Sequence, residues 1–278
     1  MSESTVERDG MSIAFSRRGS GEPFVLVHGY LGSRAQWRHV VGPLASRVEV
    51  VTFDQRGHGT SGRTGSDDDY RIDELVADAV AVIEALGAGP VHLLGHSLGG
   101  VVALRVATEQ PDLVRSLVAG DTAAAPAASG TSFAAALGRL PGPLFVPVLA
   151  GVAGLASAVM ARRTPPPPGA VDRAERAAVF RVDLRDLDRA AFRKLGTELG
   201  SYPSMVDDLV RITVPTTVIV GEGDTTLRAG ADVLAERIPN AHLEVIAGAG
   251  HSAMDDAPAA WLAAVHAHLG RATIPSAG

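Results

Sequence analysis

Short apolar segments alternate with helical patterns along the first half of this chain. The apolar segments occupy residues 24–28, 48–53, 91–94 and 113–119, and the first three are each followed by a turn that contains glycine. A continuous apolar run is typical of a strand in a parallel sheet that is covered on both faces. Residues 71–86, in contrast, place their apolar side chains at helical spacing. This alternation predicts an α/β fold with a mostly parallel central sheet, helices on both faces and right-handed crossovers.

The alternation stops after Asp121 and returns near the end of the chain. Residues 122–160 contain one charged side chain, Arg139, and residues 165–168 are four consecutive prolines. Residues 170–199 carry seven basic and six acidic side chains at helical spacing, which is typical of a solvated helix face rather than an anion site. The α/β pattern resumes with expected strands at 216–220 and 242–246 and expected helices at 229–237 and 257–269. The middle of the chain is therefore predicted to be an insertion in a single α/β sheet.

The composition excludes several classes of protein. The chain has 278 residues, of which 46% are hydrophobic, and a net charge of −6, so neither global disorder nor a nucleic-acid partner is expected. It contains no cysteine, which excludes disulfides, thiolate metal sites and cysteine nucleophiles. The first ten residues are polar and acidic, unlike a secretory signal, so we expect a cytoplasmic protein. Residues 144–160 are apolar but short for a membrane span, which favours a helix or loop packed over a pocket and leaves peripheral membrane contact as an alternative.

The strongest local signal is the segment GHSLGG at residues 95–100. It lies between an expected strand and an expected helix, which is the setting of a nucleophile elbow. The turn must be very tight, so the residues two positions before and after Ser97 have to lack side-chain bulk. Ser97 is therefore the predicted nucleophile, and a glycine-rich strand–helix turn or a phosphate-binding loop is the alternative.

A serine nucleophile needs a base and a group that orients the base. Asp224 follows the expected strand at 216–220, and His251 follows the expected strand at 242–246. Both positions lie at the carboxyl edge of the sheet, where α/β proteins place their ligands. The chain order Ser97, Asp224, His251 is the order that this type of elbow uses. Asp121, at the end of an earlier strand, is the alternative acid.

An oxyanion hole requires two backbone N–H groups near the nucleophile. The amide of Leu98, the residue after Ser97, is one candidate. The segment HGYLGS at residues 28–33 follows the first apolar strand, and its turn directs the amide of Tyr30 toward the same place. Tyr30 and Leu98 are therefore the expected oxyanion donors. The nine histidines show no spacing typical of a metal site, so neither a metal nor a cofactor is expected.

With these segments in place, the sequence resembles the α/β-hydrolase superfamily. The resemblance rests on HGYLGS at 28–33, DQRGHGTS at 54–61, GHSLGG at 95–100, GEGD at 221–224 and GAGH at 248–251. It implies a Ser97–His251–Asp224 triad, oxyanion donation by Tyr30 and Leu98, and a mainly helical cap inserted after the sixth strand. The expected core is 1–121 with 206–278, and the expected cap is 122–205.

Departures from related subfamilies narrow the expected chemistry. Ser97 stands where members resembling haloalkane dehalogenases and epoxide hydrolases carry aspartate, and Leu98 stands where proline iminopeptidases carry tryptophan. A carboxylic ester or lactone hydrolase is the best match, acting on a small molecule through an acyl-enzyme. Acyl transfer, perhydrolysis, C–C hydrolysis or a lyase step on the same triad, and a non-catalytic ligand receptor, are the alternatives. The apolar character of 122–160 favours uncharged, hydrophobic substrates. The oligomeric state is not predicted.

Overall fold

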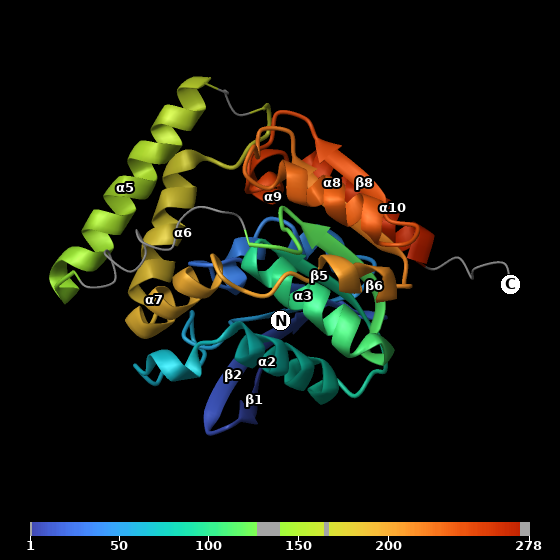
Figure 1. Ribbon diagram of the computed structural model, residues 1–278. Helices are drawn as coiled ribbons and strands as arrows, with labels where there is room; N and C mark the ends of the chain where they lie inside the picture. The colour runs from blue at the N-terminus through green and yellow to red at the C-terminus, as the bar shows by residue number, and fades with distance from the viewer. Residues whose placement is uncertain (1, 127–139, 164–166, 273–278) are drawn as a thin grey trace, which may run out of the picture.

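The computed structural model describes residues 2–126, 140–163 and 167–272 (Figure 1). One eight-stranded sheet runs through the molecule in the order β1-β2-β4-β3-β5-β6-β7-β8. The strands are β1 (Ser2–Arg8), β2 (Met11–Arg18), β3 (Pro23–Val27), β4 (Glu49–Phe53), β5 (Val91–His96), β6 (Val114–Gly120), β7 (Thr216–Gly221) and β8 (His242–Ile246). Only β1 and β2 pair antiparallel with their neighbours, and β4, β3, β5, β6, β7 and β8 form a parallel series. The predicted α/β fold with a mostly parallel sheet is confirmed.

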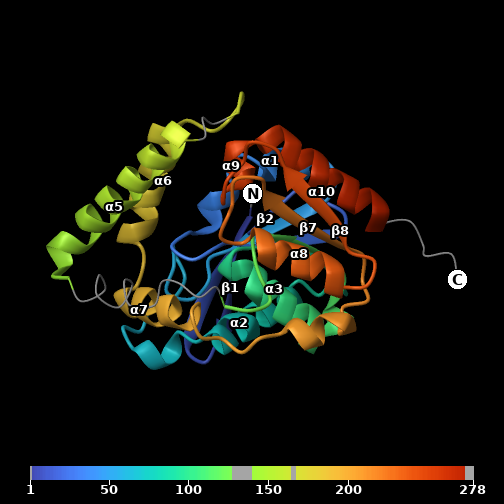
Figure 2. The same cartoon turned by 45° about the horizontal axis from the view of Figure 1, so that its top comes forward.

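Helices cover both faces of the sheet (Figures 1 and 2). The helices of the described residues are α1 (Val41–Leu44), α2 (Ile72–Ala85), α3 (Leu98–Glu109), α5 (Gly142–Arg163), α6 (Arg173–Arg185), α7 (Arg189–Glu198), α8 (Arg228–Arg237), α9 (Ala253–Asp256) and α10 (Pro258–Ala272). Short 3₁₀ helices occur at Arg34–Trp37, Asp67–Asp69, Pro111–Leu113 and Val206–Arg211.

Side chains along β3 alternate between two hydrophobic clusters, one on each face of the sheet. Val25 and Val27 pack in the cluster that contains residues of α2, α3 and α8, whereas Phe24 and Leu26 pack in the cluster that contains residues of α1 and α10. All four side chains are fully buried. A strand buried on both faces needs apolar residues at every position, which explains the continuous run in the sequence.

The first two strands have no counterpart in the sequence prediction. β1 is the exposed edge of the sheet and pairs along its whole length with β2, from Ser2 opposite Arg17 to Arg8 opposite Met11. Its sequence is SESTVER, in which the exposed polar positions give no apolar run. An edge strand of this kind forms because a partner strand supplies its hydrogen bonds, and local sequence does not show that partner.

Helices α5, α6 and α7 lie between β6 and β7 in the chain and gather on one side of the molecule. In both views α5 and α6 lie side by side, with α5 farther from the sheet (Figures 1 and 2). The expected apolar helix or loop at 144–160 is helical, and the helix continues through Pro147. In the parts of the chain that the structure describes, no helix is both long and apolar enough to cross a membrane.

A buried ion pair joins the loop after β4 to α2. The Arg56 guanidinium donates two hydrogen bonds of 2.6 Å to the two carboxylate oxygens of Asp78, and a third of 3.0 Å to the Asp69 carbonyl. The Asp78 side chain is fully buried, and 3% of the Arg56 side chain is exposed. Arg8 donates a further 3.2 Å hydrogen bond to Asp78, and Glu74 lies 3.4 Å from Arg56, so each buried charge is compensated by opposite charges.

We predict that Asp78→Ala lowers the free energy of unfolding by about 3–5 kcal/mol, because Arg56 keeps its charge, loses both hydrogen bonds to the buried carboxylate and retains only Glu74, at 3.4 Å, as an ionic partner. Urea denaturation measures the loss. The double variant Arg56→Met with Asp78→Leu should recover most of it, since neither charge is then buried. An unchanged unfolding midpoint in the single variant would contradict this account of the pair.

Candidate functional site

Ser97 lies on a sharp turn between β5 and α3. Its φ of 54° and ψ of −119° fall outside the regions that residues other than glycine usually occupy. The turn closes because two glycines approach their surroundings closely: a Cβ on Gly95 would lie 2.0 Å from the Gly99 carbonyl oxygen, and a Cβ on Gly99 would lie 2.3 Å from the Val27 carbonyl oxygen. The expected tight strand–helix turn is present. The nucleophilic role of Ser97 stays a prediction.

The structure brings Asp224 and His251 together. Asp224 follows β7, His251 follows β8, and the Nδ1 of His251 lies 2.7 Å from the Asp224 carboxylate. The other carboxylate oxygen of Asp224 accepts hydrogen bonds of 3.2 Å from the amides of Thr226 and Leu227. The Asp224 side chain is 5% exposed, whereas the His251 side chain is 47% exposed. Backbone amides therefore fix the Asp224 carboxylate through the oxygen that does not bond to His251, whereas the His251 ring is accessible to solvent.

The charges of this pair shift both pKa values. Burial acts to raise the pKa of Asp224, but the hydrogen bond with His251 and the charge of His251 lower it below its ordinary value. Burial acts to lower the pKa of His251, but the hydrogen bond to Asp224 and the charge of Asp224 raise it above its ordinary value. Asp224 is therefore an anion at neutral pH, and it stabilises the protonated form of His251.

The loop after β3 packs directly against Ser97. A Cβ on Gly29 would lie 2.9 Å from the Nδ1 of His96 and 3.2 Å from the Cβ of Ser97, so a side chain here would require these neighbours to shift. In the described ranges 2–126, 140–163 and 167–272, the amides of Tyr30 and Leu98 have no hydrogen-bond partner. The Tyr30 ring stacks on Phe192 of α7, with 5.8 Å between ring centroids, and its hydroxyl donates to the Phe192 carbonyl. Both expected oxyanion donors therefore have unpaired amides, and the Tyr30 side chain is held away on α7.

His96 lies between these groups and was not singled out by the sequence. Its Nε2 donates to the carbonyl of His251 over 2.7 Å, and its ring centroid lies 4.9 Å from that of His251. Burial, together with the nearby charge of His251, lowers the pKa of His96 to about 3. His96 is therefore neutral and positions the backbone of His251 without competing for its proton.

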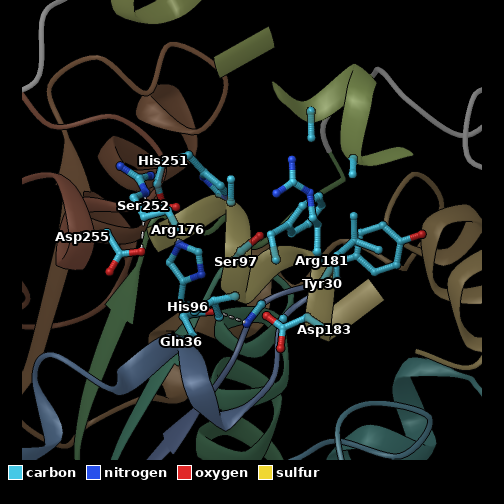
Figure 3. A pocket seen from close by; sticks show the side chains of 18 of the residues that line it. Tyr30, Gln36, His96, Ser97, Arg176, Arg181, Asp183, His251, Ser252 and Asp255 are labelled. Atoms are coloured by element: carbon cyan, nitrogen blue, oxygen red, sulfur yellow. Dashed lines mark hydrogen bonds and ion pairs between the residues drawn. The ribbon is translucent and has the colours of Figure 1, made fainter. Parts of the chain in front are cut away.

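Ser97 and His251 line one pocket with a cavity volume of about 360 Å³ (Figure 3). This volume suits one small molecule. The sheet side of the pocket comes from the loops after β3, β5 and β8, and the opposite side comes from α5 and α6. Its lining residues are Gly29, Tyr30, Leu31, Gly32, Gln36, Arg38, His96, Ser97, Ala150, Ala153, Gly154, Arg173, Arg176, Ala177, Val179, Phe180, Arg181, Asp183, His251, Ser252 and Asp255.

Polar contacts attach α6 to the loops of the sheet. Arg176 donates a 2.5 Å hydrogen bond to Asp256, which is close to His251 in the chain. The hydroxyl of Ser33 donates to Asp183 over 2.7 Å. These links join residues 80 and 150 positions apart in the sequence, so they determine which face of α6 points into the pocket.

The apolar segment 144–160 contributes to the pocket through its small residues. Ala150, Ala153 and Gly154 of α5 line the cavity. Phe145 does not line it: its side chain is 2% exposed and packs edge-on against Phe192 with a centroid distance of 5.0 Å. Phe133 and Leu137, two large apolar residues of the segment 122–160, lie outside the described residues. The large apolar side chain at 145 therefore packs against the core rather than selecting a ligand.

Asp121 is fully buried beside the Asp224–His251 pair. One of its oxygens accepts a 2.9 Å hydrogen bond from the amide of Gly221, and the other has no partner in the described part of the chain. Ligand atoms of Asp121, Asp224 and His251 all lie within 4.8 Å of one another, a spacing that a metal ion could bridge. The hydrogen bond between Asp224 and His251 occupies the facing atoms of that pair, which suits an acid and base better than a metal site.

The parallel sheet, the strained serine turn and the acid–histidine pair together define an α/β protein of the hydrolase type. The chain matches the profile of the family described as alpha/beta hydrolase fold over residues 22–258. Since this match covers most of the chain, the protein belongs to the α/β-hydrolase family.

Individual proteins of known description are similar to this chain over different lengths. The sn-1-specific diacylglycerol lipase ABHD11 of Xenopus laevis is 35% identical over 115 residues, which are 41% of this chain and 36% of the lipase. A hydrolase from Pseudomonas aeruginosa PA01 has a TM-score of 0.80 at 27% identity, covering 96% of this chain and 98% of that structure. Est816, described as an N-acyl homoserine lactone degrading enzyme, has a TM-score of 0.72 at 27% identity, covering 95% and 99%. The sequence matches span less than half the length of each curated relative.

The position of Asp121 predicts a pH-dependent stability. Burial raises its pKa to about 8. Between about pH 4 and pH 8, Asp121 therefore keeps its proton in the folded protein and loses it in the unfolded chain. The free energy of unfolding therefore falls as pH rises from about 4 to about 8. We predict that Asp121→Asn stabilises the protein relative to the wild type by about 1–2 kcal/mol at pH 8 and by much less at pH 5.

Urea denaturation at both pH values measures this difference. Asp112→Asn is the matched control, because Asp112 is exposed and should change little at either pH. If the free energy of unfolding of Asp121→Asn differed from that of the wild type by the same amount at pH 5 and at pH 8, the assignment of a protonated Asp121 would be wrong.

Proposed function

We propose that this protein is a serine hydrolase that cleaves a carboxylic ester or lactone of a small, mainly hydrophobic molecule. The observation that carries the proposal is the hydrogen-bonded Asp224–His251 pair, whose histidine shares one small pocket with Ser97. The similarity to a diacylglycerol lipase and to a lactone-degrading enzyme supports this class of substrate.

In the proposed reaction, the Ser97 hydroxyl attacks the carbonyl carbon of the substrate and His251 takes the hydroxyl proton. Asp224 holds His251 with Nδ1 protonated, which leaves Nε2 free to accept that proton, and its charge stabilises the imidazolium that forms. The unpaired amides of Tyr30 and Leu98 donate to the negative carbonyl oxygen, and the N-terminus of α3 behind Ser97 favours the same charge.

The tetrahedral intermediate then expels the alcohol, which takes the proton from His251 and leaves the acyl group on Ser97. A water molecule, deprotonated by His251, attacks this acyl-enzyme, and the acid product leaves as Ser97 regains its proton. In a lactone the alcohol and the acid are parts of one molecule, so a single hydroxy acid is released.

We further propose that residues 122–205 form a cap over a core made of 1–121 and 206–278. The contacts of α6 with the core support this division, because Arg176 and Asp183 connect one wall of the pocket to loops at the sheet's carboxyl edge. A cytoplasmic location remains an expectation from the sequence.

We predict that a fluorophosphonate probe labels Ser97, and that Ser97→Ala abolishes both the labelling and the hydrolysis of an activated ester. Intact-mass and peptide mass spectrometry locate the label. Ser252→Ala is the matched control, since Ser252 lines the same pocket. The probe should still label Ser97 in this variant. Labelling that persists in the Ser97→Ala variant would place the nucleophile elsewhere.

We predict that Asp224→Asn lowers kcat by about 10⁴, because an asparagine amide holds the wrong tautomer of His251. Asp121→Asn should have a mild effect on the same ester. In the wild type, kcat/KM should rise with pH through a pKa above the ordinary value of histidine, because His251 must be deprotonated to act as the base. A larger loss in Asp121→Asn than in Asp224→Asn would reverse the assignment of the acid.

A further inference from the structure

Arginine side chains are concentrated on the pocket that contains Ser97. Three of them, Arg173, Arg176 and Arg181, come from α6, and Arg38 comes from the loop after β3. Two carboxyl groups, Asp183 and Asp255, line the same pocket. The sequence analysis expected the charges of 170–199 to form a solvated helix face; Arg173 and Arg181 are exposed as expected, and together with the partly buried Arg176 they also line the cavity.

Two of these arginines have negative partners. Arg38 pairs with Glu175 at 3.0 Å and approaches Asp255 at 3.8 Å. Arg176 pairs with Asp256 at 2.5 Å and approaches Asp255 at 3.7 Å. Their charges are therefore largely neutralised within the protein, and they serve to hold α6 against the loops.

The other two arginines have no such partner. Across the described residues, neither Arg173 nor Arg181 makes an ion pair or a hydrogen bond. Both side chains are exposed, so they lie on the solvent side of the pocket. Arg173 is the first residue of α6, where the helix dipole adds further positive charge. In the described part of the chain, the opening of the pocket thus carries two guanidinium groups that no carboxylate pairs with.

Neither of the two lining acids pairs with Arg173 or Arg181. Asp183 is buried, receives the hydroxyl hydrogen bond of Ser33, and burial raises its pKa to about 6. Asp255 is shared between Arg38 and Arg176, and burial raises its pKa as well. In the view of Figure 3, Arg181 is drawn between Ser97 and Tyr30, on the side of the pocket away from Asp255.

We propose that the pocket binds substrates that carry a carboxylate in addition to the ester or lactone, with Arg181 as the residue that pairs with the carboxylate. This inference rests on the proposed hydrolase function and specifies its substrate. A guanidinium matches a carboxylate because its N–H groups form two parallel hydrogen bonds. Arg173, eight residues earlier on α6, adds positive potential that attracts the anion.

The proposal revises the expectation that uncharged substrates are preferred. Apolar lining from Leu31, Val179 and Phe180 still suits a hydrocarbon chain, and the arginines add a site for one charged end. The substrate class is therefore an apolar acyl chain or ring that carries one carboxylate remote from the bond to be cleaved.

Two esters with the same leaving group test the proposal. The 4-nitrophenyl monoester of adipic acid carries a terminal carboxylate, and 4-nitrophenyl hexanoate has the same chain length without the charge. We expect kcat/KM to be about tenfold higher for the charged ester, the effect of one charge-assisted pair. This preference should shrink as salt is raised, because the arginines are exposed.

Variants identify the residue responsible. Arg181→Gln should remove most of the preference for the charged ester, measured as the ratio of kcat/KM between the two esters, and Arg173→Gln should reduce this ratio less. Arg185→Gln is the matched control, because Arg185 is an exposed arginine of α6 that does not line the pocket. It should behave as the wild type with both esters.

Equal kcat/KM values for the two esters in the wild type would overturn the proposal, as would equal effects of Arg181→Gln and Arg185→Gln. A terminal phosphonate that is preferred over the carboxylate would replace the carboxylate assignment with a phosphate-type anion. Loss of the hexanoate activity in Ser97→Ala tests the hydrolase function separately.

Binding gives a readout that needs no turnover. Calorimetry on the Ser97→Ala variant compares monomethyl adipate, which is charged, with dimethyl adipate, which is neutral. We expect the charged ester to bind more tightly to Ser97→Ala, and we expect this difference to be lost in the double variant Ser97→Ala with Arg181→Gln. That result would support the anion site even if the proposed reaction were wrong. Equal binding of the two esters would overturn it.

Discussion

The close approach of β5 to the first turn of α3 is the constraint on which the site depends. Gly95 lies against the carbonyl of Gly99 with no room for a side chain, and Gly99 in turn lies against β3. This contact forces Ser97 into its unusual backbone conformation at the end of a central strand. Strands β3 and β6 flank β5 in the sheet, so the loop with Gly29 reaches Ser97 from one side. On the other side, the carbonyl of Gly120 in β6 accepts a hydrogen bond from the amide of Ser97. A single steric fit therefore sets the position of the serine and of the groups around it.

Burial and hydrogen bonding determine which groups of the site are ionised. Asp224 is buried but stays ionised, because two backbone amides and His251 bond to its carboxylate. Asp121 lies close by with one oxygen unpaired, and burial raises its pKa. Burial also keeps His96 neutral, and its ring centroid lies 4.9 Å from that of His251. Only one acid and one histidine of this group are therefore suited to carry charge during a reaction at neutral pH, and they are the two that are bonded to each other.

Local patterns in the sequence were sufficient for the parallel part of the fold and for the residues at the strand ends. The β8 strand was predicted with its observed bounds, and the turn at Ser97 followed from glycines whose steric need is local. The hairpin of β1 and β2 was missed because its polar edge strand depends on a partner. The orientation of α6 could not be predicted either. Its periodicity shows a charged face, but the contacts of Arg176 and Asp183 with distant loops decide where that face points.

The Asp256 carboxylate bonds to two parts of the molecule at once. One oxygen accepts from Arg176 on α6, and the other accepts a 2.8 Å hydrogen bond from the amide of Gly250, the residue before His251. An outward swing of α6 must either break the ionic link or pull on the peptide that carries the histidine. Widening the pocket and aligning the base are thus mechanically coupled, so a ligand bulky enough to push α6 aside would also disturb the imidazole that has to act on it.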